Sequence, residues 1–134
     1  MVGGTLILNS RYSVSEFWRI VSQERATSAS IVPTIMADLL ARADDFDREG
    51  YDISSLKKIM IGSAPVPANT ACQFVDRFGV RLIQGYGSTE VSLRVTGVPP
   101  SLSDDQYRDV LKKEIIVQAN LTLDTDLPIC FHLS

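Results

Sequence analysis

Two short loops hold the residues of this sequence that are best suited to chemistry. One is Gly85–Glu90 (GYGSTE) and the other is Gly62–Pro65 (GSAP), and each follows an apolar run. Glycines permit positive φ angles and let a ligand approach the backbone closely. Tyr86 offers a flat ring on which a planar base can stack, and Thr89 offers a hydroxyl to a phosphate oxygen. The carboxylate of Glu90 is a ligand type that Mg²⁺ accepts alongside nucleotide phosphates. These residue types suit an adenine nucleotide with magnesium.

A second interpretation of both loops is that they are plain turns. Glycines after strands are common turn residues, a single tyrosine usually serves packing, and Ser88-Thr89-Glu90 resembles a helix start. Other motifs fail: Gly-x-Gly-x-x-Gly would need glycine at position 90, and a nucleophile elbow would need serine at Gly87. No phosphate loop ending in Gly-Lys-Ser/Thr is present. The residues alone therefore indicate a nucleotide-sized crevice or two turns.

Alternating strands and amphipathic helices are predicted to position these loops. The expected strands cover residues 4–8, 27–32, 58–61 and 80–84, and the expected helices cover residues 14–25, 33–43 and 67–78. This alternation predicts an α/β fold with a mostly parallel sheet. Ligands of such sheets bind outside the carboxyl ends of the strands. Because the two loops follow consecutive strands, we expect those strands to be neighbours and the loops to face one crevice.

Local signals define the helix ends. Ser13 with Glu16 forms a capping box, and Pro33 and Pro67 each suit the first turn of a helix. Gly79 is typical of a helix C-terminus. Residues 44–55 are expected to be a polar loop with a run of charges. We divide the chain into a domain over residues 1–97 and a divergent tail over 98–134, with a helix at 103–113 and strand composition at 114–123.

Composition limits the class of protein. The 134 residues carry a net charge of −3, with 45% hydrophobic and 22% charged side chains, which fits one globular domain. The charge argues against nucleic acid or an anionic membrane as partner. No apolar run approaches the length of a membrane span, and no signal peptide is visible. Cys72 and Cys130 are read as free thiols in the reducing cytoplasm. The single histidine, His132, lies close to the end of the sequence and argues against a Ser-His-Asp triad and a multi-histidine metal site.

One string resembles a known family. Tyr86–Glu90 is similar to the Tyr-Gly-x-Thr-Glu motif of the adenylate-forming (AMP-binding) superfamily, and the resemblance is closest to acyl-CoA synthetases. Ile31–Thr34, Ser54–Lys57 and Gly62–Pro65 are similar to further segments of that family, in the same order and at matching spacings over residues 3 to about 97. The resemblance implies part of the N-terminal domain of an adenylate-forming enzyme.

The family implies an activity and a role for each site residue. Its members activate a small carboxylic acid with ATP as an acyl-adenylate and pass the acyl group to the thiol of CoA. By position, Tyr86 would stack on adenine, Thr89 would bind the α-phosphate, and Glu90 would hold Mg²⁺. Thr89 and Glu90 would thus be the catalytic pair, acting by positioning and charge neutralisation. The remaining contacts divide between adenine (Ala64, Pro65) and the acyl pocket (Gly62, Ser63, Gly85, Gly87, Ser88).

Several family segments are missing from the 134 residues, namely the Pro-Lys-Gly phosphate loop, the Arg-Thr-Gly-Asp segment and the C-terminal domain with its lysine. The chain is therefore expected to be a ligase fragment that does not catalyse adenylation alone. Two alternatives stay open: a non-catalytic α/β interaction module and a truncated gene remnant. A sheet cut from a larger one would leave apolar edges exposed, which predicts self-association. The expected uncovered side chains are Phe17, Trp18, Met36 and Phe78.

Overall fold

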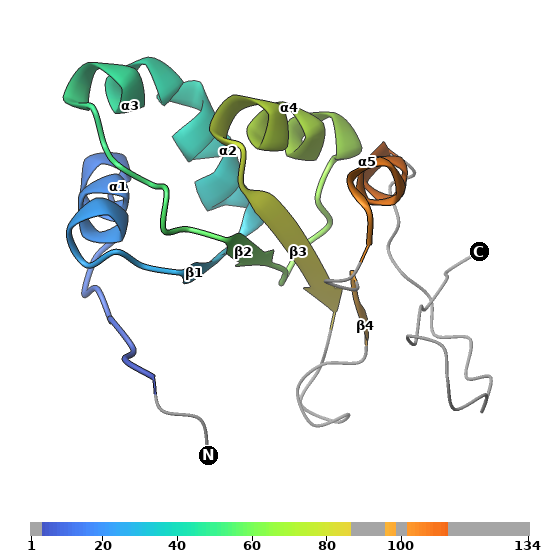
Figure 1. Ribbon diagram of the computed structural model, residues 1–134, viewed down its shortest axis with the longest axis horizontal. Helices are drawn as coiled ribbons and strands as arrows, with labels where there is room; N and C mark the ends of the chain where they lie inside the picture. The colour runs from blue at the N-terminus through green and yellow to red at the C-terminus, as the bar shows by residue number, and fades with distance from the viewer. Residues whose placement is uncertain (1–3, 87–95, 99–101, 113–134) are drawn as a thin grey trace.

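The computed structural model describes residues 4–86, 96–98 and 102–112 (Figure 1). Helices and strands alternate through most of this part of the chain. The helices are α1 (Val14–Gln23), α2 (Pro33–Ala41), α3 (Ala43–Glu49), α4 (Ala68–Phe78) and α5 (Asp104–Lys112), and the strands are β1 (Ser28–Ile31), β2 (Lys58–Ile61), β3 (Arg81–Tyr86) and β4 (Thr96–Gly97). The predicted α/β class is confirmed. No helix within these ranges is long and apolar enough to cross a membrane.

The sheet is built from parallel βαβ units. Its order is β1-β2-β3-β4, with β1, β2 and β3 parallel and β4 antiparallel to β3. Since the strand order advances in one direction, right-handed crossovers place the connecting helices on the same face of the sheet. Figure 1 shows α2 and α4 side by side over that face, with α1 and α3 beyond β1. The opposite face carries Ser28, Ser30 and Lys58, all exposed, and the half-buried Met60.

The helix ends follow the local signals in the sequence. Ser13 Oγ accepts a hydrogen bond from the Glu16 backbone N–H at 3.3 Å, as a capping serine should. Pro33 is the first residue of α2. Gly79 ends α4 in the left-handed conformation with φ 66°, which glycine adopts without steric cost. Pro33 and Gly79 are found as predicted, and of the predicted capping box the serine half is found, because the Glu16 carboxylate accepts from Arg19 Nε at 2.9 Å.

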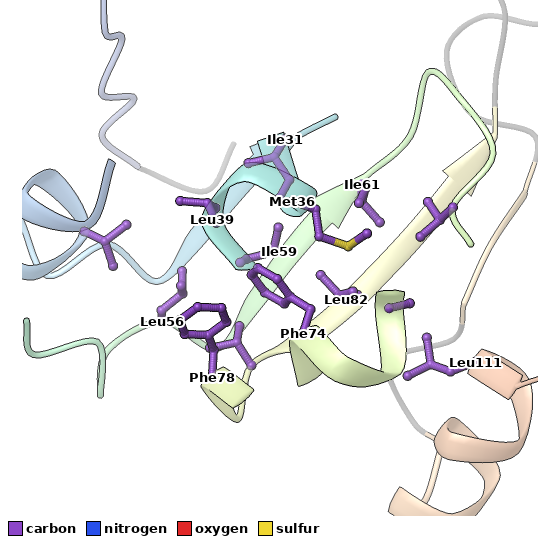
Figure 2. Close-up of a cluster of buried hydrophobic side chains, with 14 of the residues drawn as sticks. Ile31, Met36, Leu39, Leu56, Ile59, Ile61, Phe74, Phe78, Leu82 and Leu111 are labelled. Carbon is purple, nitrogen blue, oxygen red and sulfur yellow. The ribbon is translucent and has the colours of Figure 1, made fainter. Parts of the chain in front are cut away.

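The core lies between the helices and the strands. Figure 2 shows Met36, Leu39 and Phe74 of α2 and α4 facing Ile59 and Leu82 of the sheet. An aromatic group closes one end of this core: the ring centroid of Trp18 lies 4.9 Å from that of Phe46 and 4.8 Å from that of Phe78. Burying such side chains stabilises the fold by roughly 1.5–3 kcal/mol each.

The expected exposure of Trp18, Met36 and Phe78 is wrong. Trp18 and Met36 are 0% exposed, and Phe78 is 7% exposed. Phe17 is half-buried. The reason is that α1, α2 and α4 bury their apolar stripes against one another and against the sheet.

Two predicted elements are also wrong. Residues 44–55 do not form only a loop, because Ala43–Glu49 is helical. Phe46 packs on Trp18, and Gly50 ends this helix at φ 65°. Residues 4–8 form no strand: Leu6 is 80% and Leu8 83% exposed, since no described strand lies beside them.

The helix expected at residues 103–113 is confirmed as α5. Ser103 Oγ accepts from the Gln106 N–H at 3.3 Å, and Gln106 Oε1 accepts from the Ser103 N–H at 3.1 Å, which is a reciprocal capping box. This helix packs beside α4, and the Arg108 guanidinium lies 2.7 Å from a carboxylate oxygen of Asp76. The strand expected at residues 114–123 lies outside the described residues, and the division at residue 97 stays a prediction.

Candidate functional site

The two candidate loops begin side by side. Ile61 of β2 is the register partner of Gln84 of β3, so Gly62 and Gly85 follow at the same carboxyl edge of the sheet. A Cβ atom on Gly62 would lie 2.7 Å from the carbonyl oxygen of Gly85, closer than a carbon atom can approach. The expectation that these strands are neighbours is confirmed. Glycine at position 62 is what allows the two backbones to meet there.

The loop after β2 is anchored at both ends and open between them. Ile61 and Val66 are buried at 3% and 8% exposure, whereas Ser63, Ala64 and Pro65 are exposed. Ser63 has φ 70°, in the left-handed region that a serine side chain disfavours. Strain of this kind persists where the surrounding structure fixes the backbone, and it concentrates at binding sites.

The charge around the Gly62–Pro65 loop suits an anion. No acidic residue occurs in the sequence between Asp52 and Asp76. Helix α4 starts just after the loop, and neither a side-chain cap nor an acidic residue occupies its first turn. The first N–H groups of a helix carry partial positive charge. This part of the chain therefore presents no negative side chain that would repel a phosphate.

The structure covers only part of the predicted site. It brings the loop Gly62–Pro65 together with Gly85 and the backbone of Tyr86, which ends β3 opposite Thr96. Four predicted site residues lie outside the described residues: Gly87, Ser88, Thr89 and Glu90. Their roles, like the stacking role of the Tyr86 ring, stay predictions. Within the described ranges, no three histidine, cysteine or acidic side chains gather as a metal site would require.

One residue near the site was not predicted from the sequence. The hydroxyl of Tyr107 in α5 accepts a hydrogen bond from the Leu82 N–H at 2.6 Å and donates one to the Leu82 carbonyl oxygen at 3.1 Å. Tyr107 is 3% exposed, and Leu111, one helical turn later, is 8% exposed. The i, i+4 spacing of these two residues is the signal that could have indicated a buried face of this helix.

Comparison with known proteins assigns the family. Residues 1–113 match the family described as "AMP-binding enzyme", and this range includes both loops and α5. The chain belongs to the AMP-binding enzyme family. The resemblance of Tyr86–Glu90 to the adenylate-forming motif is thus confirmed at the level of the family.

Curated members of the AMP-binding family that resemble this chain are CoA ligases. A feruloyl-CoA synthase of Amycolatopsis sp is 39% identical over 90 residues, which are 67% of this chain and 18% of that protein. A probable CoA ligase of Humulus lupulus is 35% identical over 89 residues, or 66% of this chain and 16% of that protein. The chain thus spans less than a fifth of the length of these two relatives.

Solved AMP-binding structures share the fold. The amide bond synthetase McbA from Marinactinospora thermotolerans superposes with a TM-score of 0.67 at 26% identity, covering 81% of this chain and 21% of that one. The anthranilate CoA ligase AuaEII, in complex with anthranoyl-AMP, gives a TM-score of 0.59 at 26% identity, covering 69% and 17%. The βαβ units of this chain are therefore those of an adenylate-forming enzyme.

Proposed function

We propose that this chain is part of an ATP-dependent acid–CoA ligase, and that its two loops form one side of the adenylate site. The observation that carries the proposal is the contact of Gly62 with Gly85 at the carboxyl ends of β2 and β3. Nucleotides bind at this edge of parallel sheets. Membership of the AMP-binding family supports an adenine nucleotide as the ligand.

The described residues fit a nucleotide. Gly62 has no side chain at the point where it meets Gly85, and Ala64 and Pro65 expose small apolar groups beside it. The nearest acidic residues in the sequence on either side of this loop are Asp52 and Asp76. Ala64 and Pro65 would contact the edge of adenine, and Tyr86 would stack on its face. Gly62 and Ser63 would border the acyl group, together with Gly85, Gly87 and Ser88.

The chemistry that follows is substitution at the α-phosphorus. An oxygen of the carboxylate attacks this atom, pyrophosphate leaves, and a mixed anhydride of the acid and AMP remains. Thr89 would donate its hydroxyl proton to an α-phosphate oxygen, and the carboxylate of Glu90 would hold Mg²⁺. Both act by placing and neutralising charge, so no general base from the protein is required.

The acceptor in the second half-reaction is proposed to be CoA. The curated relatives at 39% and 35% identity are a feruloyl-CoA synthase and a probable CoA ligase. The amide bond synthetase found among the solved structures is less similar, at 26% identity. A thiol acceptor is therefore favoured over an amine. The cytoplasmic location stays a prediction.

Nucleotide titration tests the proposal. AMP and MgATP added to the ¹⁵N-labelled chain are expected to shift the amide signals of Gly62, Ala64 and Gly85, with weak affinity. Tyr86→Ala should lose most of the binding, because base stacking contributes about 1–3 kcal/mol. Tyr12→Ala is the matched control, since Tyr12 is 41% exposed and lies on the segment before α1.

Shifts centred on another surface, or equal affinity of Tyr86→Ala and the unaltered chain, would contradict the proposal. In a pyrophosphate exchange assay, the isolated chain is expected to form no acyl-adenylate. Rapid exchange by the chain alone would show that the missing family segments are dispensable.

A further inference from the structure

The far edge of β3 is closed by two different elements. Within the described residues, β4 pairs with Gly85 and Tyr86, and the Val98 N–H donates to the Gln84 carbonyl oxygen at 3.2 Å. Alternate residues of a strand direct their N–H and C=O groups to the same side. The backbone groups of Leu82 therefore face the same edge as those of Gln84, beyond the end of β4.

Tyr107 completes this edge with a side chain in place of a strand. Its one hydroxyl bonds to both backbone groups of Leu82, at 2.6 Å from the nitrogen and 3.1 Å from the oxygen. Leu82 is 1% exposed, so water has no access with which to replace these bonds. A buried N–H without a partner is strongly unfavourable.

Tyr107 is itself held in place from two sides. The guanidinium of Arg81 lies 5.2 Å from the centroid of its ring, donates to the Leu102 carbonyl oxygen at 3.1 Å and pairs with Asp104. The ion pair of Arg108 with Asp76 joins α5 to α4. The helix is thus fixed both to β3 and to the helix that follows the Gly62–Pro65 loop.

We propose that Tyr107 is a positioning residue for the adenylate site. Its hydroxyl fixes Leu82, and Leu82 lies in the same strand as Gly85 and Tyr86, three and four residues further on. Gly85 lies against Gly62 with no room for one added carbon atom, so a shift of β3 at Leu82 would disturb this contact at the start of the Gly85–Glu90 loop. The ligand part of this inference rests on the proposed function, whereas the effect on β3 does not.

Hydrogen exchange of individual amides in the full chain provides the test. Tyr107→Phe removes only the hydroxyl, and the Leu82 and Gly85 amides are expected to exchange about tenfold faster, with little change at Ala29 of β1. Tyr51→Phe is the control, because it removes the hydroxyl of a half-buried tyrosine away from β3 and should leave these rates unchanged. Equal rates in Tyr107→Phe and the unaltered chain, or a uniform rise over β1, β2 and β3, would overturn the inference.

Binding of AMP separates positioning from general stability. Val21→Ala removes methyl groups from a buried site on α1 and serves as a variant of reduced stability with an intact β3 edge. Tyr107→Phe is expected to weaken AMP binding about three- to tenfold, and Val21→Ala is expected to leave it unchanged. If AMP binding weakens equally in both variants, Tyr107 contributes only to the general stability of the fold.

Failure of the proposed function and failure of the inference about Tyr107 can be told apart. If the unaltered chain does not bind AMP, the proposed function fails for this chain, and the exchange rates at Leu82 and Gly85 still decide whether Tyr107 fixes the strand end. If Tyr107→Phe does not fold, Arg81→Gln removes the guanidinium from the Tyr107 ring and should accelerate exchange at Leu82. Unchanged exchange at Leu82 in Arg81→Gln would count against the inference.

Discussion

Gly62 lies directly against the carbonyl oxygen of Gly85, so that even one added carbon atom would come within 2.7 Å of it. This contact joins two loops that are 23 residues apart in the chain, as the difference of 85 and 62 gives. It links the two loops of the proposed adenylate site within the described residues.

Gly62→Ala should destabilise the fold by about 1–3 kcal/mol, because the methyl group must displace backbone rather than a flexible side chain. Urea unfolding of both proteins measures the difference. Gly4→Ala is the control, since a Cβ at Gly4 meets nothing within 4 Å. If Gly62→Ala unfolds at the same urea concentration as the unaltered chain, the contact of Gly62 with Gly85 does not restrict the residue at position 62.

Ser63→Gly should raise the free energy of unfolding, by up to about 1 kcal/mol, because glycine adopts φ 70° without the steric cost that serine bears. Arg25 has φ 49°, and Arg25→Gly is a matched variant far from the site in sequence. Thermal unfolding of both should show a gain in stability. Only Ser63→Gly is expected to change binding of the nucleotide or acid. If Arg25→Gly changes this binding as well, the strain at Ser63 has no specific role in the site.

Self-association is expected through the segment before α1. Leu6 and Leu8 are 80% and 83% exposed, and no charged side chain lies between Gly4 and Ser10 to oppose pairing with another chain. Leu6→Ser combined with Leu8→Ser should lower the apparent mass in sedimentation equilibrium at high concentration. Val32→Ser, at a second exposed position, should not. A sharp monomer peak from the unaltered chain would contradict the expectation.

Stability should fall at high pH through two tyrosines. Burial raises the pKa of Tyr107, and burial together with the hydrogen bond to Asp38 raises the pKa of Tyr12 above the ordinary value of 10.0. Above pH 10 the unfolded chain loses these protons while the folded chain keeps them, so the free energy of unfolding decreases as pH rises. Tyr107→Phe and Tyr12→Phe should each show a shallower decrease in urea unfolding between about pH 9 and pH 11. Parallel pH profiles would exclude this origin.

Local signals in the sequence account for most of the helix ends. The Ser13 cap, Pro33 at the start of α2 and Gly79 after α4 act within a few residues, and each is found as predicted. Helix α3 is not predicted although Gly50 marks its end, because its apolar face is small and depends on Phe46 packing against the distant Trp18.

Non-local features are where prediction from the sequence was weakest. A strand exists only beside another strand, so the apolar run ending in Leu8 had the composition of a strand without a partner in the described chain. The meeting of Gly62 and Gly85 was predictable, because consecutive βαβ units place consecutive strand ends together. The bond of Tyr107 to Leu82 joins residues 25 apart, and no pattern within either segment indicates it.

The helices cover one face of the sheet and leave the other face exposed. The exposed face can therefore be modified chemically without altering the covered one. Ser28, Ser30 and Lys58 point away from the helices that cover the core. With Cys72 and Cys130 replaced by serine, a fluorophore or spin label attached through cysteine at position 28 or 30 would leave the packed layer undisturbed. Such a reporter would sense directly any partner or further protein segment that comes to cover that surface.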